Sequence, residues 1–496
     1  MCTWPANDGM NRGRAARRAT GALALAALLA GCAVGPDFVR PSAPSVARFV
    51  APDDPAATSG AWTGGGRTQT LSAAEPLTRD WWTRFGSHEI DAAVGDALAG
   101  SPTLAGAQAT LRRSEHALRA GEGIFFPQTD AQAGASRQRY SPLRTGQALP
   151  GTIFNLFTLS ATVSYTLDLW GGERRQVEAL AADVDAQRQA LAGAYLMLTA
   201  NVVNTMIAHA AYRDEIAATR EMIGLLDEQI RLTRAQVTAG ATAYVAVLTL
   251  ESQRASLEAT LPALEQKRAQ ADDLLALLAG RYPADWRTPD VSLDAIALPA
   301  SLPDTAPSSL VRRRPDILQA EAQLHVASAQ VGVATAALYP NVTLSASGGF
   351  GSVVAGKLFG PAGHAWSVGA GLTAPLFHGG ALLNQRRAAQ DAYDEADAAY
   401  RQVVLSAFSQ VADTLRALAH DASALDAQAR AMAAARDALA LTQAGYEAGI
   451  TGYIQLLVAD TQFHQARIAW LQALAQRLQD TVAFYVALGG GWGEAA

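Results

Sequence analysis

The same unit occurs twice in this chain, and that duplication constrains the fold more than any other feature of the sequence. Three motifs recur in the same order, each about 210 residues further on. They are Phe126-Pro127-Gln128, which recurs as Tyr339-Pro340-Asn341; Leu169-Trp170-Gly171-Gly172, as Phe377-His378-Gly379-Gly380; and Ala239-Gly240-Ala241-Thr242-Ala243-Tyr244, as Ala448-Gly449-Ile450-Thr451-Gly452-Tyr453. Chance matches that keep both order and spacing are improbable, so the sequence predicts a duplicated fold.

Each unit contains two segments in which apolar and polar residues alternate with a period of two, as in β-strands. The clearest is 157–169, where aliphatic and aromatic residues alternate with Ser, Thr and Asp; further strands are expected at 128–139, 341–347 and 366–374. One apolar face and one small polar face suit the wall of a transmembrane β-barrel, but a soluble β-sandwich alternates in the same way. The strands alone leave both alternatives open.

A very long helix is predicted between the strands and the Gly240 turn. Residues 173–239 contain no proline, and a continuous helix of this length would extend roughly 100 Å. Apolar and small residues follow an unbroken 4-3 spacing, which predicts a left-handed coiled coil in which His209 is a packed residue. The seam positions are Leu191, Tyr195, Leu198, Val202, Thr205, His209, Tyr212, Ile216, Thr219, Ile223, Leu226, Ile230, Thr233 and Val237. Residues 88–121 are also expected to be helical, and a further helix is expected to start at Pro315.

Four strands per chain do not close a barrel, because about eight strands are the practical minimum. Within a bilayer every backbone N–H and C=O must be paired, so open sheet edges are not tolerated there. The chain is therefore expected to share its barrel with copies of itself, with eight strands in a dimer or twelve in a trimer. The predicted fold class is a mixed α+β membrane protein with an internal two-fold repeat.

The N-terminus has the features of an export signal. Four arginines between Arg12 and Arg18 precede a short apolar segment, Gly21 to Ala30. The sequence Leu29-Ala30-Gly31-Cys32 resembles a bacterial lipoprotein signal, in which cleavage leaves Cys32 as the lipidated N-terminal residue. An ordinary secretory leader that happens to be cut near Cys32 is the alternative.

Composition and charge exclude several classes of protein. Hydrophobic residues make up 50% of the 496 residues and charged residues 17%, which excludes disorder for most of the chain. The formal net charge is −6 and no Lys/Arg-rich run is present, which argues against nucleic-acid binding. No uninterrupted apolar stretch of about 18–20 residues occurs, so no transmembrane helix is expected. The eight histidines lack metal-binding spacing, and no catalytic triad can be nominated, so neither an enzyme, a cofactor nor a metal site is predicted.

These observations divide the chain into six segments. They are a signal peptide (1–31), a Pro-rich extended arm (32–86), the first repeat (87–280), a Pro-rich linker (281–312), the second repeat (313–490) and a short tail (491–496).

Three motifs carry a family resemblance: Cys32-Ala33-Val34-Gly35-Pro36-Asp37-Phe38, Arg312-Arg313-Arg314-Pro315-Asp316-Ile317 and Ala487-Leu488-Gly489-Gly490-Gly491-Trp492. In this combination the chain resembles the TolC-like outer-membrane efflux proteins, and most of all the NodT-type lipoproteins of RND efflux systems. The resemblance implies a homotrimer, lipid-anchored in the outer membrane, with a 12-stranded barrel and a periplasmic α-barrel. It also implies two partners: a periplasmic adaptor protein and an inner-membrane transporter of the RND or another class.

The resemblance also assigns roles to the two repeated turns. In the family, the hairpin tips contact the adaptor, here Gly240, Ala241, Thr242, Tyr244, Gly449 and Ile450. The neighbouring residues form the periplasmic gate, here Tyr446, Thr451, Tyr453, Ile454, Gln455 and Val458. Several relatives carry an aspartate ring at positions that match Gln455 and Val458. At about 100° per residue, Thr451, Ile454, Gln455, Val458, Gln462 and Gln465 share one helix face, which we expect to line the channel, with Asp460 on the opposite side.

The implied function is a passive, gated duct that exports drugs or other small toxic compounds. Two alternatives remain at this level. One is the exit duct of a type I protein-secretion system, which has the same fold. The other is a structural coiled-coil lipoprotein of the periplasm without a pore, against which the alternating strands argue.

Overall fold

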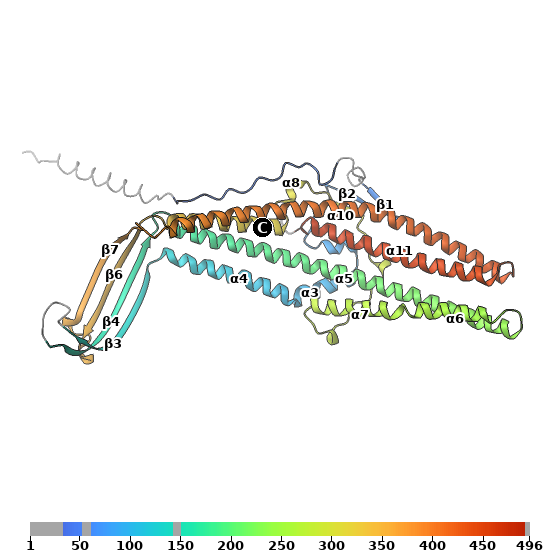
Figure 1. The fold of residues 1–496 in the computed structure, drawn as a ribbon, viewed down its shortest axis with the longest axis horizontal. Coiled ribbons are helices and arrows are strands. Elements are labelled where there is room, and N and C mark those ends of the chain that lie inside the picture. The colour runs from blue at the N-terminus through green and yellow to red at the C-terminus, as the bar shows by residue number, and fades with distance from the viewer. Residues whose placement is uncertain (1–32, 52–60, 142–149, 492–496) are drawn as a thin grey trace, which may run out of the picture. The chain divides into compact units, whose positions relative to one another are not determined.

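The computed structural model describes residues 33–51, 61–141 and 150–491 (Figure 1). The helices are α3 (His88–Gly100), α4 (Pro102–Glu122), α5 (Gly172–Thr238), α6 (Val245–Glu258), α7 (Leu261–Leu278), α8 (Pro307–Leu310), α9 (Pro315–Ala336), α10 (Ala381–Glu447) and α11 (Tyr453–Ala487). The strands are β1 (Ala61–Gly64), β2 (Arg67–Ser72), β3 (Gln128–Tyr140), β4 (Thr152–Leu167), β5 (Ser301–Pro303), β6 (Asn341–Ser352) and β7 (His364–Thr373). The chain forms two compact units, one of which contains β3, β4, β6 and β7 and the other β1, β2 and β5.

The first unit is built on a four-stranded antiparallel sheet in the order β3-β4-β6-β7. Its registers put apolar residues on one face, with Leu159 between Ala133 and Phe350, and small polar residues on the other. All four predicted strands are confirmed, but β4 begins earlier than expected, at Thr152, and ends at Leu167. It ends there because the Asp168 carboxylate accepts hydrogen bonds from the first backbone amides of α5.

The long helices of the two repeats, α5 and α10, each contain 67 residues. The predicted coiled-coil seam of α5 is confirmed, since every seam position is buried or half-buried. By length and composition α5 is also the one described helix that could cross a membrane, but 56% of its apolar window is buried within the structure. That burial is typical of a core helix.

The segment 88–121 is helical, as expected. It forms two helices, α3 and α4, because Ser101 is extended (φ −64°, ψ 118°) and Pro102 begins the second helix. Proline disfavours helical geometry at the preceding residue, so it ends one helix and starts the next.

The second unit contains a small sheet, β1-β2-β5, that the sequence did not predict. β1 and β2 form a hairpin in the N-terminal arm, and β2 pairs in parallel with β5 of the linker, with Leu71 opposite Leu302. These strands are short, and β5 pairs with β2 some 230 residues earlier in the chain. Local periodicity in the sequence therefore does not predict them.

A buried arginine holds that hairpin against the helices. Arg477 of α11 has no exposed surface. Its guanidinium donates hydrogen bonds to the carbonyls of Trp62 (2.9 Å) and Gly64 (3.1 Å) and to the Gln69 side chain (3.0 Å). Because a buried cation needs its donors satisfied, Arg477 determines where the arm docks.

Candidate gate at the tips of the helical hairpins

Both long helices reverse direction at a glycine in the left-handed conformation. The φ angles are 74° at Gly240 and 71° at Gly449. Each glycine is followed by an amide that bonds back into the helix, from Ala241 to Gln236 (2.9 Å) and from Ile450 to Gly445 (2.8 Å). This pattern is a Schellman cap, so the glycine turns behave as the sequence predicted.

The residues predicted to contact an adaptor lie at these turns. Ala241, Tyr244, Gly449 and Ile450 are exposed, and Thr242 is half-buried. Tyr244 and Ile450 are large apolar side chains that are 58% and 81% exposed. Exposed apolar groups at a tip are suited to contact with another protein.

Five of the six residues predicted to line the channel form one bare face of α11, and the sixth, Thr451, lies just before this helix. Ile454 is 71% exposed and Val458 49% exposed. Gln455, Gln462 and Gln465 are also exposed. Thr451 is half-buried, and its hydroxyl donates to the carbonyl of Thr442 (3.1 Å). The opposite face, with Leu456, Leu457 and Ala459, is buried.

Tyr446 and Tyr453 occupy a different place, between the two hairpins of the same chain. Their rings meet edge to face, with centroids 6.4 Å apart. Tyr453 packs on a small apolar core that joins α5, α6 and α11, made of Met222, Leu226, Ile230, Val247, Leu250 and Leu457. Burial raises the pKa of Tyr453, so its hydroxyl stays neutral.

Polar side chains join the same two hairpins, and the sequence analysis missed them. The amide of Gln229 donates to the Asp460 carboxylate (2.6 Å), and that of Gln253 to the Thr461 hydroxyl (2.5 Å). A third amide, from Gln236, donates to the Tyr446 hydroxyl (3.2 Å). The only sequence signal was Asp460 itself, a carboxylate on the apolar side of an amphipathic helix. Its partner lies 231 residues away and cannot be found from spacing.

Asp460 makes the stability of this tip depend on pH. The residue is 4% exposed, and burial raises the pKa of its carboxyl, while the Gln229 hydrogen bond lowers it. Because the folded protein binds this proton more tightly than the unfolded chain, stability falls as pH rises from the ordinary aspartate range, about 4, through the raised pKa.

We therefore expect Asp460→Asn to raise the thermal unfolding midpoint at pH 8, with a gain that shrinks at about pH 4. The new amide also adds a donor beside the side-chain oxygen of Gln229, which has no partner among the described residues. Thermal denaturation at the two pH values measures this. The exposed Asp437→Asn on α10 is the control and should change neither midpoint. A lower midpoint at pH 8 for Asp460→Asn would contradict this assignment.

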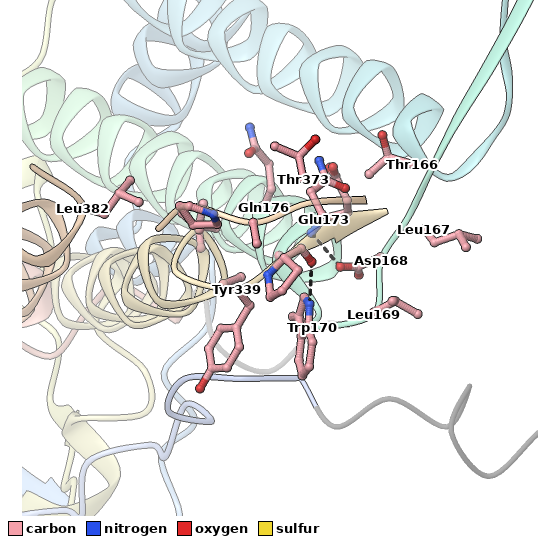
Figure 2. Close-up of a pocket in the computed structure, with 18 of the residues that line it drawn as sticks. Thr166, Leu167, Asp168, Leu169, Trp170, Glu173, Gln176, Tyr339, Thr373 and Leu382 are labelled. Carbon is pink, nitrogen blue, oxygen red and sulfur yellow. Dashed lines mark hydrogen bonds between the residues drawn. The ribbon is translucent and has the colours of Figure 1, made fainter. Parts of the chain in front are cut away.

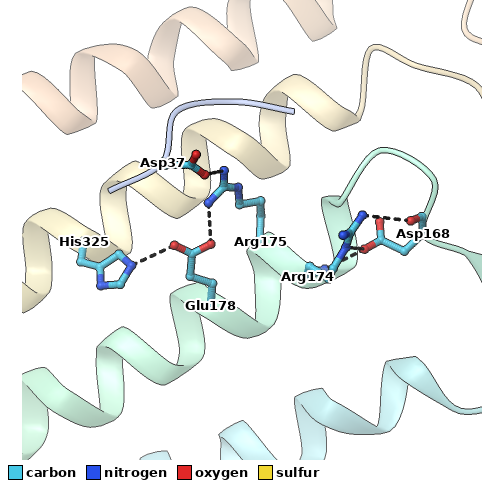
Figure 3. A network of polar contacts seen from close by, with 6 residues as sticks. All are labelled: Asp37, Asp168, Arg174, Arg175, Glu178 and His325. Carbon is cyan, nitrogen blue, oxygen red and sulfur yellow. Dashed lines mark hydrogen bonds and ion pairs between the residues drawn. The ribbon is translucent and has the colours of Figure 1, made fainter. Parts of the chain in front are cut away.

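Cys32 lies outside the described residues, but the segment that follows it is held in place (Figure 3). Residues 33–40 contact α5, α9 and the turn before α5 within the first unit. The Val34 amide donates to the Trp170 carbonyl (2.9 Å), and the Phe38 ring stacks on the His325 ring with centroids 4.3 Å apart. Two ion pairs complete the contacts, one between the Arg175 guanidinium and the Asp37 carboxylate (2.5 Å) and one between Arg40 and Glu321 (2.6 Å). Glu178 links Arg175 (2.7 Å) to His325 (2.9 Å). This network fixes where the N-terminal segment meets the first unit.

A cavity of about 430 Å³ lies where the strands of the first unit meet its helices (Figure 2). Two of its lining residues are in contact: Trp170, at the end of the first repeat's strands, stacks on Tyr339, at the start of the second's, with centroids 4.7 Å apart. The Trp170 indole N–H donates to the Pro340 carbonyl (2.8 Å). These contacts join the two repeats at the base of the sheet.

His209 is a packed residue of the α5 seam, 1% exposed, beside Asp272 (3.2 Å) and Arg268 (3.3 Å). Burial lowers its pKa, so the neutral ring is favoured. Within the described residues, no group of three His, Cys, Asp or Glu side chains is placed to hold a metal ion.

Comparison with known proteins gives consistent matches. Residues 93–281 and 306–490 each match the family described as "Outer membrane efflux protein". The chain is 31% identical to the pyoverdine export outer membrane protein OpmQ of Pseudomonas aeruginosa over 84% of this chain and 88% of that protein. It is 28% identical to nodulation protein T of Rhizobium leguminosarum bv. viciae over 95% and 93%. The solved outer-membrane channel OprN superposes with a TM-score of 0.82 at 28% identity, over 93% of this chain and all of that one.

Proposed function

This chain belongs to the outer membrane efflux protein family, whose members are channels and not enzymes, and we propose that it forms the outer-membrane part of an efflux pump. The chain is an outer-membrane channel that exports drugs or other toxic compounds. Three copies form one duct, which receives its cargo from a periplasmic adaptor and an inner-membrane transporter of the RND or a related class. The duct is passive, and its gate lies at the hairpin tips.

The observation that carries the proposal is the four-stranded sheet. Its edge strands, β3 and β7, each pair on one side only within the described chain. The strands alternate in direction across the sheet, so β3 and β7 run opposite ways. Copies placed side by side therefore continue an antiparallel ladder, and three copies close it with twelve strands.

The apolar face of the sheet supports a lipid-facing wall. Trp366, Val368 and Leu372 on this face of β7 are 70–75% exposed. A soluble β-sandwich would cover this face with a second sheet, whereas a barrel wall leaves it to lipid. The exposed apolar face therefore favours a channel over the structural coiled-coil lipoprotein without a pore.

The gate follows from the bare face of α11. In a trimer, three copies of this face would converge, with Ile454 and Val458 as neutral, apolar rings. Gln229, Gln236 and Gln253 tie the hairpins of each subunit together, so opening must break or reorganise these contacts. The adaptor would act at the exposed tips, around Gly240 and Gly449, where its binding can shift the equilibrium between the closed and the open gate.

Single-channel recording and drug susceptibility test the function together. The purified protein in a planar bilayer should conduct, and deletion of its gene should sensitise cells to compounds that the cognate pump exports. A chain that never conducts, in a strain of unchanged susceptibility, would contradict the proposal. Loss of export of a protein substrate instead of small molecules would favour the type I secretion duct.

Lipidation at Cys32 should anchor the chain without building the pore. Cys32→Ala removes acyl chains, each worth about 0.8 kcal/mol per buried CH₂, but leaves four membrane strands per subunit. We expect the variant trimer in the outer-membrane fraction at a somewhat reduced level, measured by fractionation and metabolic palmitate labelling. Recovery of the variant wholly in the soluble periplasm would show that the anchor is required for insertion.

A further inference from the structure

The apolar face of the four-stranded sheet changes character at the end that lies away from the helices. On β3 this face carries Ala131, Ala133 and Ala135. Because side chains alternate between the two faces of a strand, the next two residues on this face are Arg137 and Arg139. Both arginines are exposed. The apolar face of β3 therefore ends in two adjacent positive charges.

The height of these arginines matches the rim of a lipid-facing band. On the neighbouring strand β4, the same face is aliphatic or aromatic from Leu167 to Phe157. At about 3.4 Å per residue and a tilt of about 40°, this stretch covers roughly 26 Å, close to the apolar band of about 25 Å in outer-membrane barrels. Arg137 lies opposite Asn155, the next residue on this face of β4, and Arg139 lies two residues further out. Both arginines are thus placed at the level of the lipid headgroups.

No carboxylate of the protein is available at this level to pair with the arginines. Residues 131–167 and 341–377 include nearly all of the sheet and its two outer connections. They contain three arginines and one lysine but no Asp or Glu, although the whole chain has a net charge of −6. The flanking acids, Asp130 and Asp168, lie towards the other end of the strands. A second copy of the chain brings the same sequence to this level, so a fixed counter-charge must come from outside the protein.

We propose that Arg137 and Arg139 bind the phosphate groups of a glycolipid in the outer leaflet of the outer membrane, at one site on the lipid-facing rim of each subunit. The outer leaflet of this membrane consists mainly of lipopolysaccharide, whose lipid-proximal sugars carry phosphate. The site rests on the orientation in the proposed function, with the helices in the periplasm and the strand connections at the cell surface. It adds an anionic lipid ligand to that function.

The placement of the two side chains suits a phosphate group. Arginine presents a planar fork of N–H donors that binds phosphate through two parallel hydrogen bonds. Two residues apart on one strand, the Cα atoms are about 7 Å apart, so both guanidinium groups can reach one headgroup. Arg139 leans outward, since its Nε lies 2.9 Å from the position that a Cβ on Gly151 would take. Gly151 directly precedes β4, and its missing side chain leaves this outward path open.

Binding of purified lipopolysaccharide to the full-length trimer in detergent tests the proposal. Fluorescence anisotropy of labelled lipopolysaccharide should show saturable binding that weakens as ionic strength rises, because the contact is electrostatic. Arg137→Gln combined with Arg139→Gln should raise the dissociation constant at least about tenfold, which corresponds to about 1.4 kcal/mol. Enzymatic removal of the phosphates from lipopolysaccharide should weaken its binding to the wild-type protein to a similar extent.

A charge-matched variant controls for the loss of net charge. Adding Ser136→Arg and Gln138→Arg to the double glutamine variant restores two arginines at the same height of β3. They then lie on the opposite, polar face of the sheet, because neighbouring residues of a strand face opposite sides. This variant should bind lipopolysaccharide as weakly as the double glutamine variant.

The outcomes separate this inference from the proposed function. Unchanged affinity in the double glutamine variant would overturn the site. Equal binding of dephosphorylated lipopolysaccharide, or full recovery by arginines on the polar face, would overturn it as well. In each of these cases, a trimer that conducts in a bilayer free of lipopolysaccharide leaves the proposed function standing. A wild-type protein that neither forms trimers nor conducts would contradict the proposed function itself.

Discussion

Replacing Gly449 with valine is expected to reduce drug export to the level of a strain that lacks the protein, while the trimer still assembles. The residue has φ 71°, and a Cβ there costs roughly 1–2 kcal/mol per copy, more for a β-branched side chain. No atom lies within 4 Å of a Cβ placed at Gly449, so the cost comes from the backbone alone. The turn must then deform at the tip, far along the chain from the strands that hold the trimer. Drug susceptibility, adaptor cross-linking and native electrophoresis measure the three consequences.

Gly224→Val in α5 is the matched control. A Cβ there also meets open space, but the glycine has ordinary helical geometry. This variant should export normally. Normal adaptor cross-linking in Gly449→Val would show that the adaptor does not depend on the tip.

Val458→Asp is expected to create a high-affinity site for trivalent cations at the periplasmic end of the channel. The wild-type face of α11 presents apolar or amide side chains, and the nearest carboxylate on this helix, Asp460, is buried. Two unit charges about 4 Å apart attract by about 1 kcal/mol even in water, and three carboxylates facing a trivalent ion multiply that term. We expect block at concentrations at least about tenfold lower than in the wild type, since tenfold corresponds to about 1.4 kcal/mol. Bilayer recording with hexamminecobalt(III) on the periplasmic side measures it.

Two variants control for charge and size. Val458→Asn should leave block weak, because the side chain has similar size but no charge. Leu248→Asp places the same charge on an exposed position of α6, in the other hairpin, and should also have little effect. Strong block of the wild-type channel would show that an acidic ring lies elsewhere and that the face of α11 assigned here is wrong. The block in Val458→Asp should weaken at high ionic strength, as an electrostatic effect must.

The sequence by itself determined the features that depend on local periodicity. The alternation at 157–169 and the 4-3 seam through α5 each repeat over many residues, so they predict strands and a coiled-coil helix without knowledge of any partner. The two turns could also be predicted from their glycines, because a left-handed cap strongly favours glycine. The bare face of α11 also follows from helical spacing alone.

Only the tertiary structure decided which distant residues meet. The hairpin β1–β2, its partner β5 and the buried Arg477 lie hundreds of residues apart, and each short segment is stable only in contact with the others. The same holds for Gln229 and Asp460: a buried carboxylate needs a hydrogen-bond donor, but the sequence does not show which residue supplies it. Periodicity thus fixes which face of an element is buried, whereas the polar contacts that lock one element to another depend on how the chain is folded back on itself.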